Sequence, residues 1–341
     1  MKTSQFDYHL PPSLIAQHPS RRRSDSRMLV LNRADQSISD SRFGRLPEHL
    51  DQSFFIVFND SRVFKARLVG HRISGGMVEV FLVRPTGDEG WLALLRPSAR
   101  IKRGEKIFFD HRRFVTILDD PGPTERMVAF PSSPDEHFII GRYGRVPLPP
   151  YITREAEAGE RRRYQTVFAR ATGSVAAPTA GLHFNRTMLS RLAQASIDHD
   201  MITLHVGPGT FRPVVAHDIE QHIVDPEFAV ITPQTALSIN RGFDRGKKLL
   251  AVGTTTVRTL ETAAARSRRI APWEEMVDLF IYPPYQFRVV DALLTNFHLP
   301  RSSLLMLVAA FCGREFVLDA YQYAVRKKYR FYSYGDCMLI L

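Results

Sequence analysis

A stretch of small residues, 173–184, contains polar side chains that could bind or act on a ligand. It reads Gly-Ser-Val-Ala-Ala-Pro-Thr-Ala-Gly-Leu-His-Phe and has no Asp, Glu, Lys or Arg. Small side chains let a backbone approach a ligand closely, and free N–H groups at a helix start attract anionic or electron-rich groups. We expect a loop leading into a helix that begins near Thr179 or His183 and continues to Ala195, with Ser174, Thr179 and His183 as site candidates. A tight turn between packed elements explains the composition equally well.

Two glycine turns directly follow apolar runs of strand length. Residues 201–206 lead into Gly207-Pro208-Gly209-Thr210, and residues 248–252 lead into Gly253-Thr254-Thr255, with Arg258 one turn later. A strand, a glycine, hydroxyl groups and a helix start can hold a phosphate, a ribose or a carboxylate. Threonine capping of the helix and a structural bend are the competing explanations. Neither turn matches a Walker A loop or G-x-G-x-x-G, so no nucleotide class follows from them.

Polar clusters also follow two other strand-like runs. Asn59-Asp60-Ser61-Arg62 comes after residues 54–58, and Asn296-Phe297-His298 comes after residues 291–295. In open α/β sheets, ligands bind beyond the carboxyl ends of the strands, so both clusters are candidate sites. The alternatives are an ordinary turn for Asn-Asp-Ser and a structural role for a lone histidine. His222 and Glu227, which are close in the sequence, are weaker candidates.

The elements that position these residues are expected to form a discontinuous α/β domain with a mixed sheet, residues 1–66 and 151–341. A chain of 341 residues, 44% of them hydrophobic, is long enough for two domains. Between these two segments, residues 67–150 contain short runs of strand length separated by turns such as Ser74-Gly75-Gly76. Regularly spaced short strands predict an inserted all-β, barrel-like domain. In the second segment, a further strand is expected at residues 276–282.

The chain is basic, with 46 Lys and Arg against 35 Asp and Glu and a net charge of +11. This excess favours a polyanionic partner, with nucleic acid ahead of a membrane surface. Solvated charge is the commoner reason for a basic run. The residues expected to contact RNA lie in three segments: Arg21, Arg22, Arg23, Arg161, Arg162, Arg163, Lys327, Lys328 and Arg330.

Several kinds of site are disfavoured. The two cysteines, Cys312 and Cys337, form no C-x-x-C, and H-E-x-x-H is absent, so we expect no metal site, redox pair or disulfide framework. The N-terminus lacks the apolar segment of a signal peptide, and the longest apolar run, 304–312, is too short to cross a bilayer. A soluble cytoplasmic protein is expected.

Long motifs over nearly the whole chain resemble the S-adenosylmethionine:tRNA ribosyltransferase-isomerase family of queuosine biosynthesis. They are residues 10–33, 58–63, 146–151, 173–184, 204–211, 252–261, 280–283, 291–300 and 331–338. The resemblance implies transfer and rearrangement of the ribosyl group of S-adenosylmethionine onto 7-aminomethyl-7-deazaguanine at the wobble position of tRNA. The implied products are epoxyqueuosine, adenine and methionine. S-adenosylmethionine is then a consumed substrate, no cofactor is expected, and tRNA is the partner of a protein that we expect to be a monomer.

The implied reaction needs a base. A sulfonium acidifies the neighbouring C5′–H, and histidine accepts protons near neutral pH. We predict His183 as this base, ahead of His205 and His298, because His183 lies in the charge-poor stretch. A structural histidine that holds a loop is the alternative for each. The residues predicted to bind substrate are Asn59, Asp60, Arg62, Ser174, Thr179, Gly207, Gly209, Thr210, His222, Glu227, Gly253, Thr254, Thr255, Arg258, Tyr282 and Asn296.

Three positions depart from the family pattern. Asp225 stands where the family has a histidine, Thr256 where it has a serine, and Pro284 where it has a glycine after Tyr-Pro. Two rival functions stay open. An S-adenosylmethionine-dependent RNA methyltransferase needs a glycine-rich loop after its first strand, which we do not find. A non-catalytic tRNA-binding protein needs only structural glycine turns.

Overall fold

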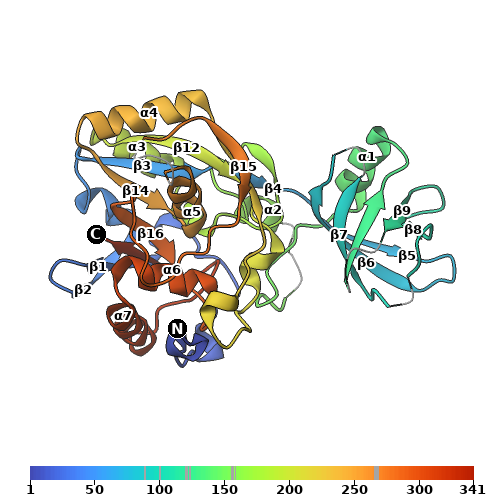
Figure 1. Ribbon diagram of the computed structural model, residues 1–341, viewed down its shortest axis with the longest axis horizontal. Helices are drawn as coiled ribbons and strands as arrows, with labels where there is room; N and C mark the ends of the chain where they lie inside the picture. Colours follow the sequence, from blue (N-terminus) through green and yellow to red (C-terminus); the bar gives the residue numbers. More distant parts are fainter. Residues whose placement is uncertain are drawn as a thin grey trace.

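A mixed nine-stranded sheet forms the body of the protein (Figure 1). The computed structural model describes residues 1–87, 90–99, 101–119, 122, 124–154, 157, 159–264 and 269–341. The strand order is β15-β13-β12-β3-β14-β16-β17-β1-β2. The strands are β1 Arg27–Asn32, β2 Ser37–Arg42, β3 Phe54–Asn59, β12 Asp198–Leu204, β13 Glu227–Ile231, β14 Lys248–Val252, β15 Trp273–Val277, β16 Ala292–Asn296 and β17 Cys337–Ile340. Strands β12, β3, β14 and β16 run parallel, so their carboxyl ends share one edge of the sheet.

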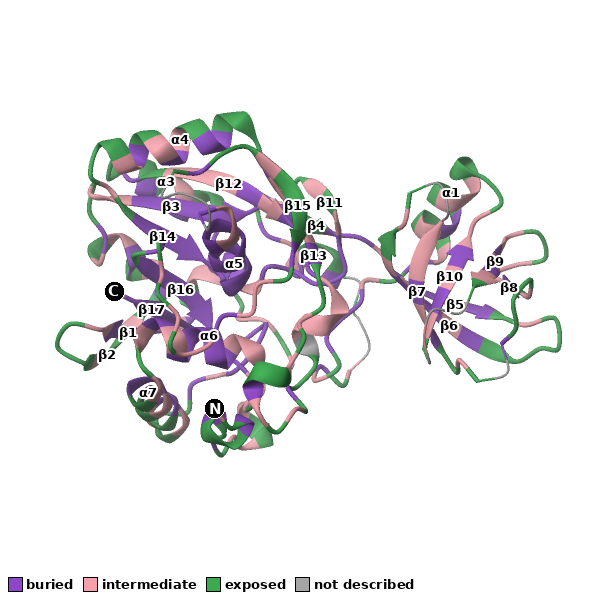
Figure 2. Ribbon diagram, in the orientation of Figure 1, coloured by how far each residue is buried: buried purple, intermediate pink, exposed green. Residues whose placement is uncertain are grey.

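Both faces of the central strands of this sheet are buried (Figure 2). In β3, Phe55 and Val57 pack into one layer, whereas Ile56 and Phe58 pack into the other, because successive side chains point to opposite faces. Burial on both faces explains why the central strands read as continuous apolar runs. One face packs against α4 Pro233–Asp244, α5 Thr254–Ala263, α6 Ser303–Cys312 and α7 Arg314–Arg326; the other packs against α3 Arg186–Gln194, η4 Phe43–Glu48 and η5 Thr179–His183.

A closed barrel of six antiparallel strands stands apart from the sheet (Figure 1). Its order is β10-β7-β6-β5-β8-β9, with β5 Arg67–His71, β6 Met77–Pro85, β7 Trp91–Arg96, β8 Lys106–Phe108, β9 Phe114–Asp119 and β10 Glu125–Ala129. Alternate residues of β6, such as Val78, Val80 and Leu82, fill its core. Helix α1 Ser133–Tyr143 follows, capped by the Ser132 hydroxyl. The predicted α/β fold with an inserted barrel-like domain is confirmed, while the exact limits at residues 67 and 150 stay a prediction.

Two chain segments join the barrel to the sheet domain. Arg67 and Arg145 pair as an isolated bridge, with N···O distances of 3.2 and 2.8 Å. A two-stranded parallel ribbon, β4 Ser61–Val63 with β11 Ala171–Ser174, lies on the sheet side of this junction. Phe64 and Val175 extend the barrel core towards the ribbon. The junction of the barrel therefore lies next to the ribbon that carries the predicted residues Arg62 and Ser174.

Two expectations about local structure were wrong. The predicted strand at 276–282 is instead β15 Trp273–Val277, and Phe280 and Tyr282 pack on each other in an irregular segment, with ring centroids 4.9 Å apart. The predicted helix through 195 is broken in two. Asn185 has extended backbone, with φ −132° and ψ 170°, and its side chain accepts a hydrogen bond from Met188 N, so it ends the first helix and caps α3.

The remaining helices are short. They are α2 Glu160–Arg163, η1 Thr3–Phe6, η2 Pro12–Leu14, η3 Arg23–Asp25, η6 Pro208–Phe211 and η7 Ile219–Gln221. Over the residues that the structure describes, no helix combines the length and apolar character needed to cross a membrane.

Candidate active site

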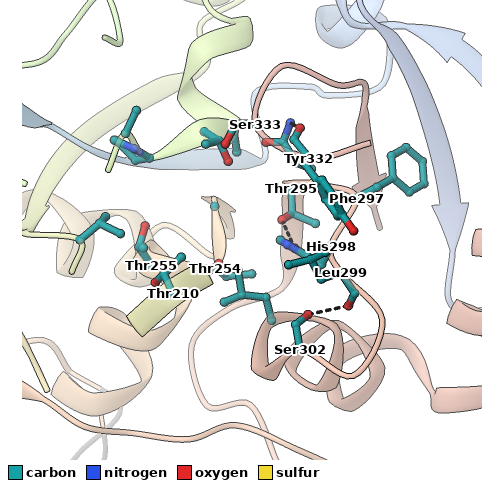
Figure 3. A pocket seen from close by; sticks show the side chains of 18 of the residues that line it. Thr210, Thr254, Thr255, Thr295, Phe297, His298, Leu299, Ser302, Tyr332 and Ser333 are labelled. Carbon is teal, nitrogen blue, oxygen red and sulfur yellow. Dashed lines mark hydrogen bonds between the residues drawn. The ribbon is translucent and has the colours of Figure 1, made fainter. Parts of the chain in front are cut away.

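A cleft lies at the shared carboxyl edge of the parallel strands (Figure 3). Of the predicted residues, it brings together Thr179, Thr210, Gly253, Thr254, Thr255, Asn296 and His298. The other described residues that line it are Tyr151, Ala177, Pro178, Ala180, Val206, Thr295, Phe297, Leu299, Ser302, Leu304, Tyr332 and Ser333. This described lining contains no Asp, Glu, Lys or Arg. The cleft therefore offers hydroxyl, amide and imidazole groups in a largely apolar setting.

Asn59 ties the strand ends together beneath the cleft. Its Nδ2 donates to Leu204 O at 3.0 Å and to Thr255 Oγ1 at 3.3 Å, and its Oδ1 accepts from Leu204 N at 3.1 Å and Ser61 N at 3.0 Å. Asn59 is almost fully buried. One side chain thus fixes the exits of β3 and β12 and the first turn of α5, which is a positioning role rather than direct contact with a ligand.

The turn after β14 depends on glycine. Gly253 has φ +93°, a conformation that residues with a side chain rarely adopt. It lets the chain turn sharply from β14 into α5, so that Thr254 and Thr255 enter the cleft lining. Thr256, which stands where the family has a serine, is fully buried and its hydroxyl donates to Val252 O at 2.8 Å. A serine hydroxyl can make the same bond, so Thr256 is compatible with this turn.

His298 is the one of the three candidate histidines that lines the cleft. Its Nε2 lies 2.9 Å from Thr295 Oγ1, and Figure 3 shows the two side chains directed at each other. Its backbone N–H donates a hydrogen bond to Tyr321 Oη at 3.0 Å. Tyr8 Oη donates a hydrogen bond to its carbonyl oxygen at 2.5 Å. Burial lowers the pKa of His298 to about 3. The ring is therefore neutral at physiological pH; Thr295 holds the ring, and the two tyrosines hold its backbone.

His183 lies behind the cleft. Its Nδ1 is 3.0 Å from Ser26 Oγ and its Nε2 is 3.2 Å from the Asn296 side-chain nitrogen, which can only donate. Burial, reinforced by Arg330 and Arg23, lowers its pKa to about 3. Both ring nitrogens therefore have protein partners, and the ring supports Asn296, which does line the cleft.

His205 lies on the barrel side of the site. Its Nδ1 is 2.7 Å from Ser61 Oγ, which in turn is 2.6 Å from Ser174 Oγ. The ring lies flat against Gly173, where an added Cβ would come within 2.5 Å of its Nε2. Burial lowers its pKa. The predicted residue Ser174 also accepts from Val206 N at 2.8 Å, so it fixes the chain that follows β12.

Glu227 and Arg258 form a buried pair beside the glycine turn. Arg258 Nη1 donates to Glu227 Oε2 at 2.5 Å, and Gly207 N donates to Glu227 Oε1 at 2.8 Å. Thr210 Oγ1 lies 3.4 Å from the same oxygen. The carboxylate therefore anchors the turn that carries Thr210 into the cleft. Asp225, which stands where the family has a histidine, lies against Gly209. A Cβ added at Gly209 would come within 2.3 Å of a carboxylate oxygen of Asp225.

Four more predicted residues also lie outside the cleft lining. Asp60 is buried and accepts from Thr203 Oγ1 at 2.6 Å, whereas Arg62 is exposed on the β4 ribbon. His222 packs edge-on against Phe280, with ring centroids 5.2 Å apart, and Tyr282 also packs on Phe280. His222 also borders an adjoining hollow that shares Thr210 and Leu304 with the cleft.

The three predicted basic segments pack against one another. Arg23 Nη2 donates to Gln165 O at 2.7 Å, and Arg163 and Arg330 donate to the backbone and hydroxyl oxygens of Ser20. Burial, together with Arg163, lowers the pKa of Arg23 to about 10. Arg23, Arg163 and Arg330 thus hold the segments together. The exposed residues of the three segments are Arg21, Arg22, Arg161, Arg162, Lys327 and Lys328. We call all nine residues together the basic cluster.

The basic cluster adjoins the cleft. A small depression lined by Arg23, Arg163 and His183 also includes Ser333, and Ser333 lines the cleft itself. Arg23 and Arg163 of the basic cluster therefore lie next to the cleft lining. Among the described residues, no group of His, Cys, Asp and Glu is arranged to hold a metal ion.

Sequence reasoning missed five polar residues of the cleft: Tyr151, Thr295, Ser302, Tyr332 and Ser333. Tyr151 Oη lies 2.5 Å from Ser333 Oγ, and the rings of Tyr151 and Tyr332 are 4.6 Å apart. Tyr332 has φ +71°, which is rare for a bulky residue and is concentrated at functional sites. Tyr151 lies in the motif at 146–151, Thr295 in the motif at 291–300, and Tyr332 and Ser333 in the motif at 331–338, so these motifs are the sequence signals that could have indicated these four.

Comparisons with known proteins agree with this architecture. A family model described as "Queuosine biosynthesis protein" matches residues 3–340. Proteins named S-adenosylmethionine:tRNA ribosyltransferase-isomerase from Syntrophotalea carbinolica and Aquifex aeolicus are each 46% identical to this chain over the full length of both proteins. A crystal structure of S-adenosylmethionine tRNA ribosyltransferase from Thermotoga maritima matches with a TM-score of 0.58 and 36% identity, covering 99% of this chain and 100% of that chain. The resemblance found in the sequence is confirmed: this chain belongs to the queuosine biosynthesis protein family.

Proposed function

We propose that this protein is an S-adenosylmethionine:tRNA ribosyltransferase-isomerase. It transfers the ribosyl group of S-adenosylmethionine to 7-aminomethyl-7-deazaguanine at the wobble position of tRNA and rearranges it, so that epoxyqueuosine forms and adenine and methionine leave. Family membership supports this reaction. The observation that most directly supports the cleft as its site is a neutral, buried histidine among hydroxyl groups, with no Asp, Glu, Lys or Arg in the described lining.

His298 is the base in this proposal. The sulfonium acidifies the C5′–H, so a neutral imidazole can take the proton. Burial lowers the pKa of His298, so the ring is in the neutral form that can accept a proton. Thr295 orients the ring through Nε2, and a cleft that limits water favours transfer of the proton within the site. This order differs from the sequence expectation, which placed His183 first.

His183 and His205 are positioning residues in the same proposal. His183 holds Asn296, and His205 holds the ribbon through Ser61. Asn296 Oδ1 is buried and has no hydrogen-bond partner among the described residues. A buried acceptor without a partner is costly, so we propose that it accepts a hydrogen bond from S-adenosylmethionine after a small adjustment on binding.

The exposed arginines and lysines of the basic cluster hold the tRNA backbone, because phosphates need cations beside the cleft. We propose further that S-adenosylmethionine is consumed as a substrate, that no cofactor takes part, and that the protein acts as a monomer in the cytoplasm. Sedimentation of the purified protein with and without tRNA tests the monomer directly.

Adenine release tests the proposed function. The protein is incubated with S-adenosylmethionine and tRNA that carries 7-aminomethyl-7-deazaguanine, and free adenine and methionine are measured by chromatography. We expect equimolar release that requires the precursor base. Matched tRNA with an ordinary wobble guanine is the control. Release that stays at background with the precursor tRNA contradicts the proposal and favours a non-catalytic RNA-binding protein.

A further inference from the structure

A second, larger cleft separates the barrel from the sheet domain. Its volume is about 660 Å³. From the barrel side it is lined by β6, β7 and α1, including Arg84, Trp91 and His137. From the sheet side it is lined by His205 and Phe228 among others. The proposed reaction site does not use this barrel wall.

Aromatic rings line both sides of this second cleft. Trp91 packs on Phe64 with ring centroids 5.4 Å apart. His205 stacks on Phe228 at 6.1 Å, with planes inclined by 23°. Trp91, His205 and Phe228 are each only partly buried. Partly exposed aromatic side chains on two walls of one cleft suit a flat, aromatic ligand.

The ring of His205 is fixed in place before any ligand arrives. Ser61 Oγ holds its Nδ1 at 2.7 Å, and Gly173 supports its flat face. Any side chain at Gly173 would displace the ring, because an added Cβ would lie 2.5–2.7 Å from three of its atoms. The sheet-side wall is therefore preorganised, which limits the entropy lost on binding.

Arginine side chains flank the rings. Arg84 is exposed on the barrel side. On the sheet side, exposed Arg62 of β4 is in register with Thr172 of β11, and Thr172 lines the cleft. Base-stacking rings between cations are the combination by which proteins hold a single nucleotide of RNA, with rings for the base and cations for its phosphates.

One short turn borders both clefts. Gly207 and Glu227 line the second cleft, and Glu227 Oε1 accepts from Gly207 N at 2.8 Å and from Thr210 Oγ1 at 3.4 Å. Thr210 lines the first cleft. A base in the second cleft therefore lies beside the turn that also carries Thr210 into the first cleft.

We propose that the second cleft holds one nucleobase turned out of the RNA, stacked between Trp91 and the His205–Phe228 pair. This inference rests on the proposed function, which identifies the base as the modified purine at the wobble position. Its flanking phosphates lie near Arg62 and Arg84, and its aminomethyl group points across the glycine turn towards the first cleft. An enzyme that acts on a base must take it out of its stack, which this cleft accommodates.

Trp91 itself can report the base. The chain has two tryptophans, and Trp273 lies at the end of β15 that pairs with Ile231, away from this cleft. In a Trp273→Phe protein, Trp91 is the only tryptophan. This protein is titrated with an anticodon stem–loop RNA carrying 7-aminomethyl-7-deazaguanine at the wobble position, and with the same RNA made abasic there. We expect strong quenching of Trp91 emission by the first RNA and little by the abasic RNA at saturation. Equal quenching by the two RNAs, or none by either, overturns the proposal.

Turnover gives a second test. Trp91→Ala should raise KM for the precursor tRNA about tenfold, the loss expected for one stacking contact, and Trp91→Phe should restore most of it. S-adenosylmethionine affinity should stay within twofold in both, and Trp273→Phe is the matched control. If the native protein releases no adenine, the proposed function fails. If it releases adenine but Trp91→Ala keeps a normal KM and the quenching does not depend on the base, only this inference fails.

Discussion

Nε2 of His298 lies 2.9 Å from Oγ1 of Thr295 inside the first cleft, and the ring is neutral because burial lowers its pKa to about 3. This pair gives the first prediction. His298→Ala should fold and bind both substrates, but it should lose exchange of C5′ deuterium from labelled S-adenosylmethionine into solvent. Loss of a general base typically lowers the rate by about 10²–10⁴-fold. Exchange is followed by mass spectrometry of recovered S-adenosylmethionine.

His183→Ala is the informative comparison for that experiment. Because Ser26 and Asn296 hold both ring nitrogens of His183, we expect this variant to bind S-adenosylmethionine more weakly but to retain measurable exchange once saturated. Full exchange in His298→Ala together with none in His183→Ala would reverse the two roles and restore the order expected from the sequence.

The second prediction concerns the hydroxyl of Thr255, which accepts from Asn59 and lines the cleft. Thr255→Val should weaken S-adenosylmethionine binding by about 1–3 kcal/mol, because a buried polar group of the ligand or of Asn59 loses its partner. Thr259→Val is the matched control. Thr259 lies one turn later in α5, is fully buried, and bonds only Thr255 O at 3.0 Å among the described contacts. Equal weakening by calorimetry in both variants would show a general effect on the helix.

The third prediction is acid sensitivity of the fold. Burial, with help from Arg330 and Arg23, lowers the pKa of His183 to about 3. The unfolded chain then binds a proton below the ordinary histidine pKa of about 6.5, whereas the folded protein does not until about 3. The histidine therefore costs no stability above pH 6.5, and below it the unfolding free energy falls by up to about 1.4 kcal/mol per pH unit.

Urea unfolding at pH 7 and pH 5 tests this. The loss of unfolding free energy between these pH values should be smaller by about 2 kcal/mol in His183→Gln than in the native protein. His111→Gln, which removes an exposed histidine of the barrel domain, should leave the loss unchanged. A native-like loss in His183→Gln would mean that the ring is protonated in the folded protein.

The fourth prediction separates the exposed and the structural members of the basic cluster. Arg162 is exposed and can contact a phosphate. In Arg162→Ala, the slope of log K for tRNA binding against log salt concentration should become shallower by about 0.7–0.9, which is the contribution of one phosphate contact. Arg241→Ala on α4, also exposed, should leave the slope unchanged. Arg23→Ala should instead lower stability, because Arg23 bonds several backbone carbonyls. An unchanged slope for Arg162→Ala places the tRNA elsewhere.

The sequence predicted a cleft loop well where the polar residues and the strand before them lie in one continuous segment. Asn59, Thr255 and Asn296 each follow a strand of the parallel set, and parallel strands bring their carboxyl ends to one edge, so their convergence follows from the fold class. The barrel was predictable for a similar reason, because its short strands and turns are local features.

Contacts between distant segments could not be predicted in this way. The His183 ring forms a hydrogen bond through Nδ1 with the hydroxyl of Ser26, which is 157 residues away in the sequence. Nothing in the charge-poor stretch indicates this contact. Tyr332 enters the cleft through a turn with φ +71° that the tertiary structure imposes. The broken helix at Asn185 was missed because its side-chain cap competes with helix continuation, and a periodic pattern does not reveal which of the two is favoured.

The fate of S-adenosylmethionine tests the central claim most directly. The protein is incubated with precursor tRNA and S-adenosylmethionine that carries ¹³C in the ribose, or in a parallel reaction in the methyl group, and the wobble nucleoside is analysed by mass spectrometry. We predict that the ribose label enters the nucleoside in full and that the methyl label leaves with methionine. Methyl label in the tRNA, with the ribose label absent from it, would contradict ribosyl transfer and identify a methyltransferase.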